Sequence, residues 1–184
     1  MQTGMPIRKK TILFLCHSNG GRSLMAEAYA NSVRSDDVTA YSAGLVPQSS
    51  VSPVVLAELT ANGISPENLF PKCITRFSTA AAPRLDYLIT LCDTDEAAPV
   101  PHWPDMPVKA LWTVPDPCRR IGSIRDQRER VAISFQIIVK CVTMFLSIPD
   151  AMLAHFARNE PRGLDIDANT IALMSKSLRR HAMA

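Results

Sequence analysis

Short apolar runs, separated by polar segments rich in glycine and proline, make up most of this chain. Four runs have the apolar, β-branched or aromatic character of buried strands: residues 11–16, 38–42, 87–92 and 108–112. Each is too short for a helix of ordinary length and ends at a turn signal or a change of composition. The pattern therefore predicts four strands.

Longer segments with helical signals lie between and after these runs. Residues 23–33 consist mainly of good helix formers and begin with a serine. Ser52-Pro53 and Gly63 enclose a second helix, with a polar N-cap, a proline in the first turn and a glycine past the end. A third and longer helix is predicted over residues 124–148. Helices thus alternate with strands along the chain.

The long helix at residues 124–148 carries two apolar stripes. One consists of Val131, Phe135, Ile138, Val142 and Phe145, and the other of Ile137, Cys141, Met144 and Ile148. Together they form an apolar arc that is wider than one contact with a sheet requires. We therefore expect one side to pack on the sheet and the other on the C-terminal segment or on a second subunit, as in a homodimer.

This order of elements predicts the α/β class, with a single doubly wound domain and a four-stranded parallel sheet flanked by helices. We expect this domain to span residues 11–148. Residues 149–184 are expected to form a C-terminal helical extension with a polar linker over residues 158–167. In sheets of this type ligands bind beyond the carboxyl ends of the strands, so the residues that follow the strands are the functional candidates.

The composition narrows the class of protein further. Apolar residues make up 47% and charged residues 20%, as in soluble globular proteins. The net charge of +3 comes from scattered basic residues, which does not favour a nucleic-acid surface. No signal peptide is evident, and we expect no membrane span, because the apolar stretch at residues 135–148 is interrupted and too short.

The five cysteines form no C-x-x-C pair and are irregularly spaced. This argues against a zinc site or a secreted disulfide framework and favours reduced thiols in the cytoplasm. Asp93, Asp95 and Glu96 are expected to be a solvated acidic cluster, and no bound metal or cofactor is predicted.

Cys16 ends the first strand and is followed by a glycine-rich loop, Arg22 and the start of a helix. Backbone amides of such a loop and the helix N-terminus point at one centre and create an anion site. The expected oxyanion-binding residues are His17, Ser18, Asn19, Gly20, Gly21, Arg22 and Ser23. A buried structural cysteine before an ordinary turn is the alternative interpretation.

The same surroundings favour a thiolate at Cys16. A free cysteine has a pKa of about 8.5, which helix N-termini and nearby cations lower. Arg22 offers a planar fork that suits two oxygens of a tetrahedral oxyanion. Ser23 is expected to donate a hydrogen bond to the sulfur, and Asn19 is suited to a positive-φ position in the loop.

Four segments together resemble the low-molecular-weight protein tyrosine phosphatase superfamily, which includes the thioredoxin-coupled arsenate reductases. They are CHSNGGRSLMAE from Cys16, AYSAG from Ala40, LITLCD from Leu88, and Asp116-Pro117. The resemblance covers about residues 11–148. It implies that Cys16 is the nucleophile, that Arg22 binds the oxyanion and that Asp116 is the general acid.

Two features of the chain favour the arsenate reductase branch. Phosphatases of this type carry tyrosines after the Asp-Pro pair, where this chain has Cys118-Arg119-Arg120. Cys92 stands where the reductases have their second redox cysteine, which arsenate reduction needs because it takes two electrons. Cys92 is expected to attack Cys16, and a disulfide requires their Cα atoms to lie within about 7 Å.

The resemblance fails at two cysteine positions. The third cysteine of the thioredoxin-coupled enzymes is absent from residues 96–99, and the second loop cysteine of many relatives is Gly21 here. Either a small thiol reduces the protein, or Cys118 takes the third redox role. The expected donor is thioredoxin or the glutathione–glutaredoxin pair. A phosphatase acting on phosphate esters, and a weakly active oxyanion-binding module that regulates a partner, are the alternative functions.

Overall fold

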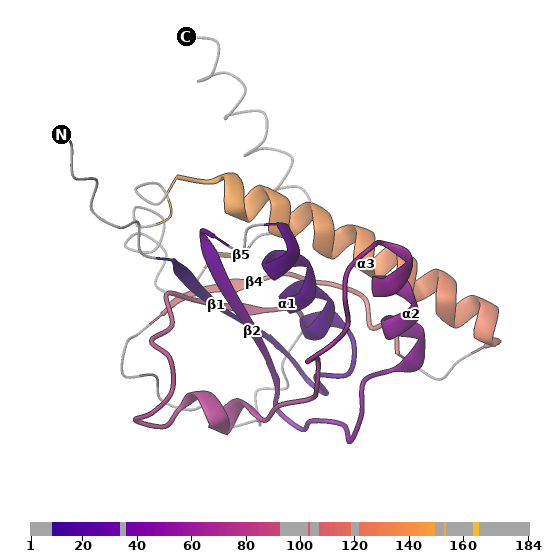
Figure 1. Ribbon diagram of the computed structural model, residues 1–184, viewed down its shortest axis with the longest axis horizontal. Coiled ribbons are helices and arrows are strands. Elements are labelled where there is room, and N and C mark those ends of the chain that lie inside the picture. The colour runs from indigo at the N-terminus through magenta and orange to yellow at the C-terminus, as the bar shows by residue number, and fades with distance from the viewer. Residues whose placement is uncertain are drawn as a thin grey trace, which may run out of the picture.

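The computed structural model describes residues 9–33, 36–92, 103, 107–118, 122–149, 153 and 164–165. Its sheet is parallel throughout, with the strand order β2-β1-β3-β4-β5 (Figure 1). The strands are β1 (Lys10–Cys16), β2 (Val38–Gly44), β3 (Tyr87–Thr90), β4 (Val108–Leu111) and β5 (Leu164–Asp165). The predicted four-stranded parallel sheet is confirmed as β1 to β4.

Apart from shifts of one or two residues at the ends of β1, β2 and β4, the sheet differs from the prediction at two places. β3 ends at Thr90 and not at Cys92, so Cys92 lies two residues beyond the strand. β5 falls in the segment predicted to be a polar linker, where Leu164 and Asp165 pair with Ala110 and Leu111 of β4. A two-residue strand formed by backbone hydrogen bonds has no side-chain periodicity that could predict it. Most of the predicted C-terminal helical extension lies outside the described residues.

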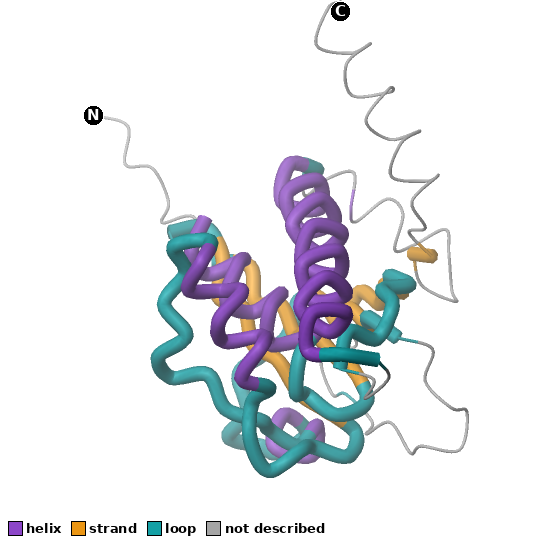
Figure 2. Tube along the Cα trace, turned by 90° about the vertical axis from the view of Figure 1, so that its right-hand side faces the viewer, coloured by secondary structure: helices purple, strands orange, loops and turns teal. Residues whose placement is uncertain are grey.

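Three helices cover one face of the sheet: α1 (Arg22–Val33), α2 (Pro53–Ala61) and α3 (Ile124–Ser147). Figure 2 shows α1 and α3 standing side by side in front of the strands. On the other face, the described residues include the short 3-10 helix η1 (Ile74–Phe77), which the sequence analysis did not predict. Four residues carry too little periodicity for such an element to be recognised.

The alternation of side chains along β1 divides the core between the two faces. Ile12, Phe14 and Cys16 belong to the cluster under the helices, whereas Leu13 and Leu15 belong to the cluster beside η1. All five are at most 1% exposed. β1 is therefore buried on both sides, as its continuous apolar run predicts.

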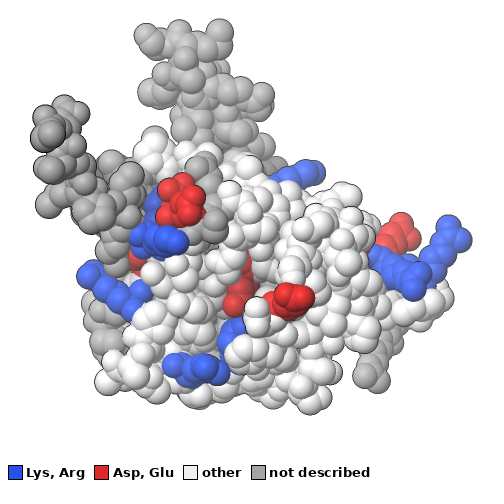
Figure 3. Space-filling view, viewed as in Figure 1, with Lys and Arg blue, Asp and Glu red and all other residues white. Residues whose placement is uncertain are grey.

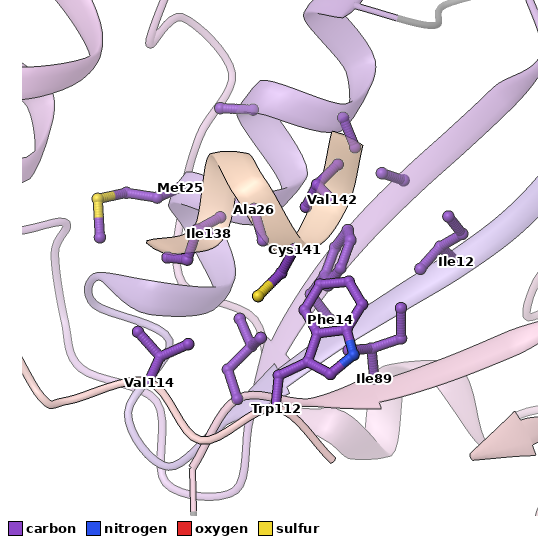
Figure 4. Packing of buried hydrophobic residues seen from close by; sticks show 14 of the residues in the cluster. Ile12, Phe14, Met25, Ala26, Ile89, Trp112, Val114, Ile138, Cys141 and Val142 are labelled. Carbon is purple, nitrogen blue, oxygen red and sulfur yellow. The ribbon is translucent and has the colours of Figure 1, made fainter. Parts of the chain in front are cut away.

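Aromatic rings fix α3 on the sheet. Trp112 lies 5.9 Å from Phe14 and 5.8 Å from Phe145, and Tyr87 lies 5.0 Å from Phe145 between ring centroids. Figure 4 shows Trp112 and Phe14 beside Cys141 of α3. The ring pairs are tilted or edge-to-face, the geometries that aromatic pairs prefer. Cys141 is thus a core residue, at 6% exposure.

α3 buries its first predicted stripe completely and its second only in part. Val131, Phe135, Ile138, Val142 and Phe145 are at most 3% exposed, whereas Ile137 and Met144 are half-buried. α3 has 24 residues and is longer than the apolar stretch at residues 135–148 on which the expectation of no membrane span was based. By length and composition alone, α3 could cross a membrane. Its buried stripe on the sheet is the arrangement of a core helix. A second subunit on the other stripe stays a prediction.

On the face shown in Figure 3, Lys and Arg side chains and Asp and Glu side chains lie in several separate places, with a group of both signs at the right-hand end. The chemical candidates are concentrated at the carboxyl ends of β1, β3 and β4.

The end of β2 lies against the loop that follows β1. Cys16 pairs with Gly44 in the sheet register. A Cβ atom placed on Gly44 would lie 2.8 Å from the backbone nitrogen of Asn19 and 2.9 Å from the carbonyl oxygen of His17. Only a residue without a side chain allows this approach, because both contacts are with backbone atoms.

We expect Gly44→Ala to lower the free energy of unfolding by about 1–3 kcal/mol, the usual effect of overpacking. Urea denaturation checks this. The matched control is Gly20→Ala, whose added Cβ would meet only the end of the flexible Gln48 side chain. Equal losses in the two variants would contradict the importance of the Gly44 contact.

Candidate active site

The loop between β1 and α1 is held from outside through its carbonyl groups. The carbonyls of Cys16, His17, Ser18 and Gly20 accept hydrogen bonds from the backbone amides of Leu45, Val46, Gln48 and Ser52. In a trans peptide the N–H points away from the C=O of the same unit. The loop amides therefore point toward the interior of the loop, next to the N-terminus of α1. This is the geometry of an anion-binding nest.

Cys16 lies at the base of this loop and is 1% exposed. Its Sγ is 2.9 Å from the Oγ of Ser23. Ser23 Oγ also accepts a hydrogen bond from Asn19 Nδ2 at 2.8 Å, which leaves the hydroxyl proton to donate to the sulfur. A donor in this position stabilises a thiolate and so prepares Cys16 for nucleophilic attack.

Asn19 organises the loop through both ends of its amide. Its Nδ2 donates to Ser23 and, at 2.9 Å, to Ser42 Oγ, while its Oδ1 accepts from the backbone N–H of Lys72 at 2.7 Å. Asn19 is completely buried and has a φ of 45°. Asparagine tolerates this left-handed conformation better than most residues, as the sequence analysis expected.

A buried ion pair ends this hydrogen-bond network. Lys72 Nζ lies 2.9 Å from Glu27 Oε2, and their side chains are 6% and 12% exposed. Ser42 Oγ donates to the same Glu27 oxygen at 2.5 Å, and Lys72 Nζ also donates to the carbonyl of Phe70. Burial raises the pKa of the Glu27 carboxyl, and the charge of Lys72 opposes this effect. A continuous chain of hydrogen bonds thus links the sulfur of Cys16 to Lys72.

The sequence analysis missed Glu27, Ser42 and Lys72. Glu27 lies four residues after Ser23 on α1, so one helix face carries both, which is a weak signal. Ser42 was recognised only as part of a strand. The backbone N–H of Lys72 contacts the side chain of Asn19, which lies 53 residues earlier in the sequence. No local sequence pattern marks Lys72 as part of the site.

Arg22 connects the loop to the ends of two other strands. Its Nη1 donates to the carbonyl oxygens of Val114 at 3.0 Å and Leu91 at 3.5 Å. Both bonds use one nitrogen, and a guanidinium has further N–H groups with which to bind an oxyanion. The segments after β3 and β4 are thereby held at the mouth of the loop.

Asp116 and Cys118 follow β4 at the same edge. Asp116 is exposed, and its Oδ1 accepts a hydrogen bond from the Cys118 backbone N–H at 3.0 Å. Burial, and after it the negative charges of Asp116 and Cys16, raise the pKa of the half-buried Cys118 thiol to about 11, against the opposing effects of Ser52 and Arg22.

Cys118 also contacts the loop directly. A Cβ atom placed on Gly21 would lie 2.8 Å from the Sγ of Cys118. The sulfur therefore occupies the space in which a side chain at position 21 would begin. Nothing in the local sequence indicates this contact, because it depends on how the segment after β4 folds back over the loop.

The remaining candidates are Cys92, His17 and three acidic residues. Cys92 is 6% exposed and belongs to the same apolar cluster as Cys16. The side chain of His17 is exposed. Asp93, Asp95 and Glu96 lie outside the described residues. Within the part of the chain that the structure describes, no three His, Cys, Asp or Glu side chains are close enough to hold a metal ion.

We expect Lys72→Met to destabilise the protein by about 3–5 kcal/mol at neutral pH, because it leaves the Glu27 charge buried and unpaired. Without the lysine the pKa of Glu27 rises further, so the folded state is favoured when this carboxyl is protonated. The loss should therefore be small near the ordinary Glu pKa of about 4.5 and grow as the pH rises.

Urea unfolding of the wild type and the variant at pH 5 and pH 7.5 tests this expectation. The double variant Lys72→Met with Glu27→Gln removes both charges and should regain much of the stability. A Lys72→Met loss that does not change with pH would show that Glu27 is not the group responsible.

Comparison with known proteins places this geometry in a family. Residues 11–129 match the family model "Low molecular weight phosphotyrosine protein phosphatase". An arsenate reductase of Staphylococcus aureus is 32% identical over 123 residues, which cover 65% of this chain and 90% of that protein.

Two solved structures share the fold. The arsenate reductase of Archaeoglobus fulgidus superposes with a TM-score of 0.53 and 25% identity, over 72% of this chain and 98% of that one. A thioredoxin-dependent arsenate reductase of Corynebacterium glutamicum superposes with a TM-score of 0.50 and 24% identity. The match covers 74% of this chain and 63% of that one. The loop around Cys16, the parallel sheet and the sequence match agree, and the chain belongs to the low molecular weight phosphotyrosine protein phosphatase family.

Proposed function

We propose that this protein is a thiol-dependent arsenate reductase in which Cys16 attacks the arsenic. The observation that carries the proposal is the presence of a second thiol, Cys118, against the oxyanion loop of the first. A phosphatase needs one thiolate, whereas the reduction of arsenate needs two sulfur atoms to supply two electrons. The relatives named arsenate reductases support the same assignment.

In the first step the loop binds arsenate through its inward-facing amides and the Arg22 guanidinium. The Cys16 thiolate forms a bond to arsenic, and one arsenate oxygen leaves as water. Asp116, exposed at the mouth of the loop, supplies the proton that this oxygen needs. The hydroxyl of Ser23 lies 2.9 Å from the sulfur of Cys16, where it can donate a hydrogen bond as the sulfur attacks.

In the second step another thiolate attacks the Sγ of Cys16. The sulfur–arsenic bond breaks, and arsenic keeps the electron pair and leaves as arsenite. Each sulfur gives up one electron, so the protein is left with one disulfide, and an external thiol returns it to the reduced state. Cys92 and Cys118 are the two candidates for the attacking thiol. Such a cycle requires a reducing compartment, which supports a cytoplasmic location.

Hydrolysis of phosphate monoesters is the second candidate function. The position of Asp116 beside Cys118 at the loop supports it, because a general acid there can protonate an ester oxygen as well as an arsenate oxygen. Phosphate and arsenate are both tetrahedral oxyanions, so the same loop suits either.

Arsenite production by the purified protein tests the proposal, with thioredoxin or with glutathione and glutaredoxin as the donor. Cys16→Ser should abolish it, and Asp116→Asn should reduce it about 10²- to 10⁴-fold, the range for loss of a general acid. Cys73→Ser is the matched control, because this half-buried cysteine lies at the start of η1 and takes no part in the proposed chemistry.

Hydrolysis of an aryl phosphate by the wild type, dependent on Cys16 but without arsenite formation, would make the protein a phosphatase. Absence of both activities would favour the oxyanion-binding module.

A further inference from the structure

An open cleft of about 770 Å³ lies next to the proposed site. One wall is formed by residues 48–54, and the other by Cys118 and the first turns of α3. Its volume is within the range of small-molecule sites, about 300–1,000 Å³. The cleft thus offers room for a ligand larger than an oxyanion.

The lining of this cleft is polar and carries one positive charge. Its hydrogen-bonding side chains include Gln48, Ser49, Ser50, Ser52 and Gln127. Arg130 is the only charged residue among those that line the described cleft. Hydroxyl and amide groups suit the peptide groups of a small ligand, and a guanidinium suits a carboxylate. The chemistry favours a small anionic peptide over an apolar or cationic molecule.

Cys118 is the point at which the cleft meets the oxyanion loop. It lines the cleft together with Ser52 of the opposite wall, and its sulfur lies over Gly21. A thiol that enters the cleft therefore meets Cys118 before it meets Cys16, which is 1% exposed. Cys118 is half-buried in the lining of the cleft. A small thiol can therefore reach it more easily than the active-site loop of a folded donor protein can.

We propose that this cleft binds a small anionic peptide thiol of the glutathione class, and that Cys118 is the residue that receives its electrons. This inference rests on the proposed arsenate reductase function, and it makes Cys118 the thiol that attacks Cys16. The Asp116 carboxylate accepts a 3.0 Å hydrogen bond from the Cys118 backbone N–H, and the thiol proton of Cys118 passes to solvent in the open cleft.

The return to the reduced state then balances. The ligand thiolate bonds to the Sγ of Cys118, and Cys16 leaves as a thiolate with the electron pair. A second ligand thiolate attacks the ligand sulfur of this mixed disulfide, and Cys118 leaves and takes up a proton. Two ligand thiols become one ligand disulfide for each arsenate reduced to arsenite and water. Attack on Cys118 is the favoured direction, because Cys118 lines the cleft whereas Cys16 is 1% exposed.

The first test does not depend on arsenate. The full chain is oxidised with diamide, treated with one equivalent of reduced glutathione and analysed by intact-mass and peptide mass spectrometry. A Cys16–Cys118 disulfide is expected first, followed by a glutathionyl group on Cys118. A disulfide or adduct that involves Cys92 and not Cys118 would overturn the inference.

The second test measures arsenite formation with glutathione as the donor. Arg130→Ala should raise the KM for glutathione about tenfold, the effect of losing a charge-assisted hydrogen bond. Arg128→Ala is the matched control, because Arg128 is exposed on α3 and does not line the cleft. Cys118→Ser should abolish glutathione-dependent turnover, and Cys92→Ser should retain it.

Three outcomes separate this inference from the proposed function. Turnover with thioredoxin but not with glutathione would overturn the cleft assignment and leave the reductase intact. Glutathione-dependent turnover that survives Cys118→Ser would do the same. No arsenite with any donor would refute the reductase, whereas glutathionylation of Cys118 in the first test would still support the cleft as a thiol site.

Discussion

The side-chain amide of Asn19 is the interaction on which the rest of the site depends. It joins the loop to α1 through Ser23, to β2 through Ser42 and to the segment before η1 through the backbone of Lys72. These partners are completely or almost completely buried, so water cannot reach them. Each hydrogen bond therefore satisfies a polar group that would otherwise have no partner. The loop can therefore keep its amides facing inward without a bound anion.

Much of the fold could be predicted from the sequence, because β1 to β4 and the three helices are defined by local periodicity and capping residues. The loop chemistry could be predicted for a similar reason, since Cys16, Arg22 and Ser23 lie within eight consecutive residues. β5 and η1 could not, because both are too short to carry a pattern. The end of β3 was placed two residues too late, because apolar character continues past Thr90 and Leu91 still donates a backbone hydrogen bond to Leu15 of β1.

The parts of the site that could not be predicted all depend on contacts between distant segments. Lys72 reaches Glu27 across 45 residues, and Cys118 reaches Gly21 only because the segment after β4 folds over the loop. In the sequence, Cys92 fitted the redox role by its position in a motif, and Cys118 was a secondary candidate. In the structure, the Cys118 sulfur lies against Gly21 of the loop, and Cys92 belongs to the same buried apolar cluster as Cys16.

The contact between Gly21 and Cys118 links the identities of two residues, at positions 21 and 118, that lie 97 positions apart in the chain. The small volume beside Gly21 holds one sulfur atom, the Sγ of Cys118. This atom comes from the segment after β4 and not from the loop. The two positions cannot both carry a side chain directed into this volume. Among homologues, the residue types at these two positions should therefore vary together, so that a side chain at one is accompanied by its absence or reorientation at the other.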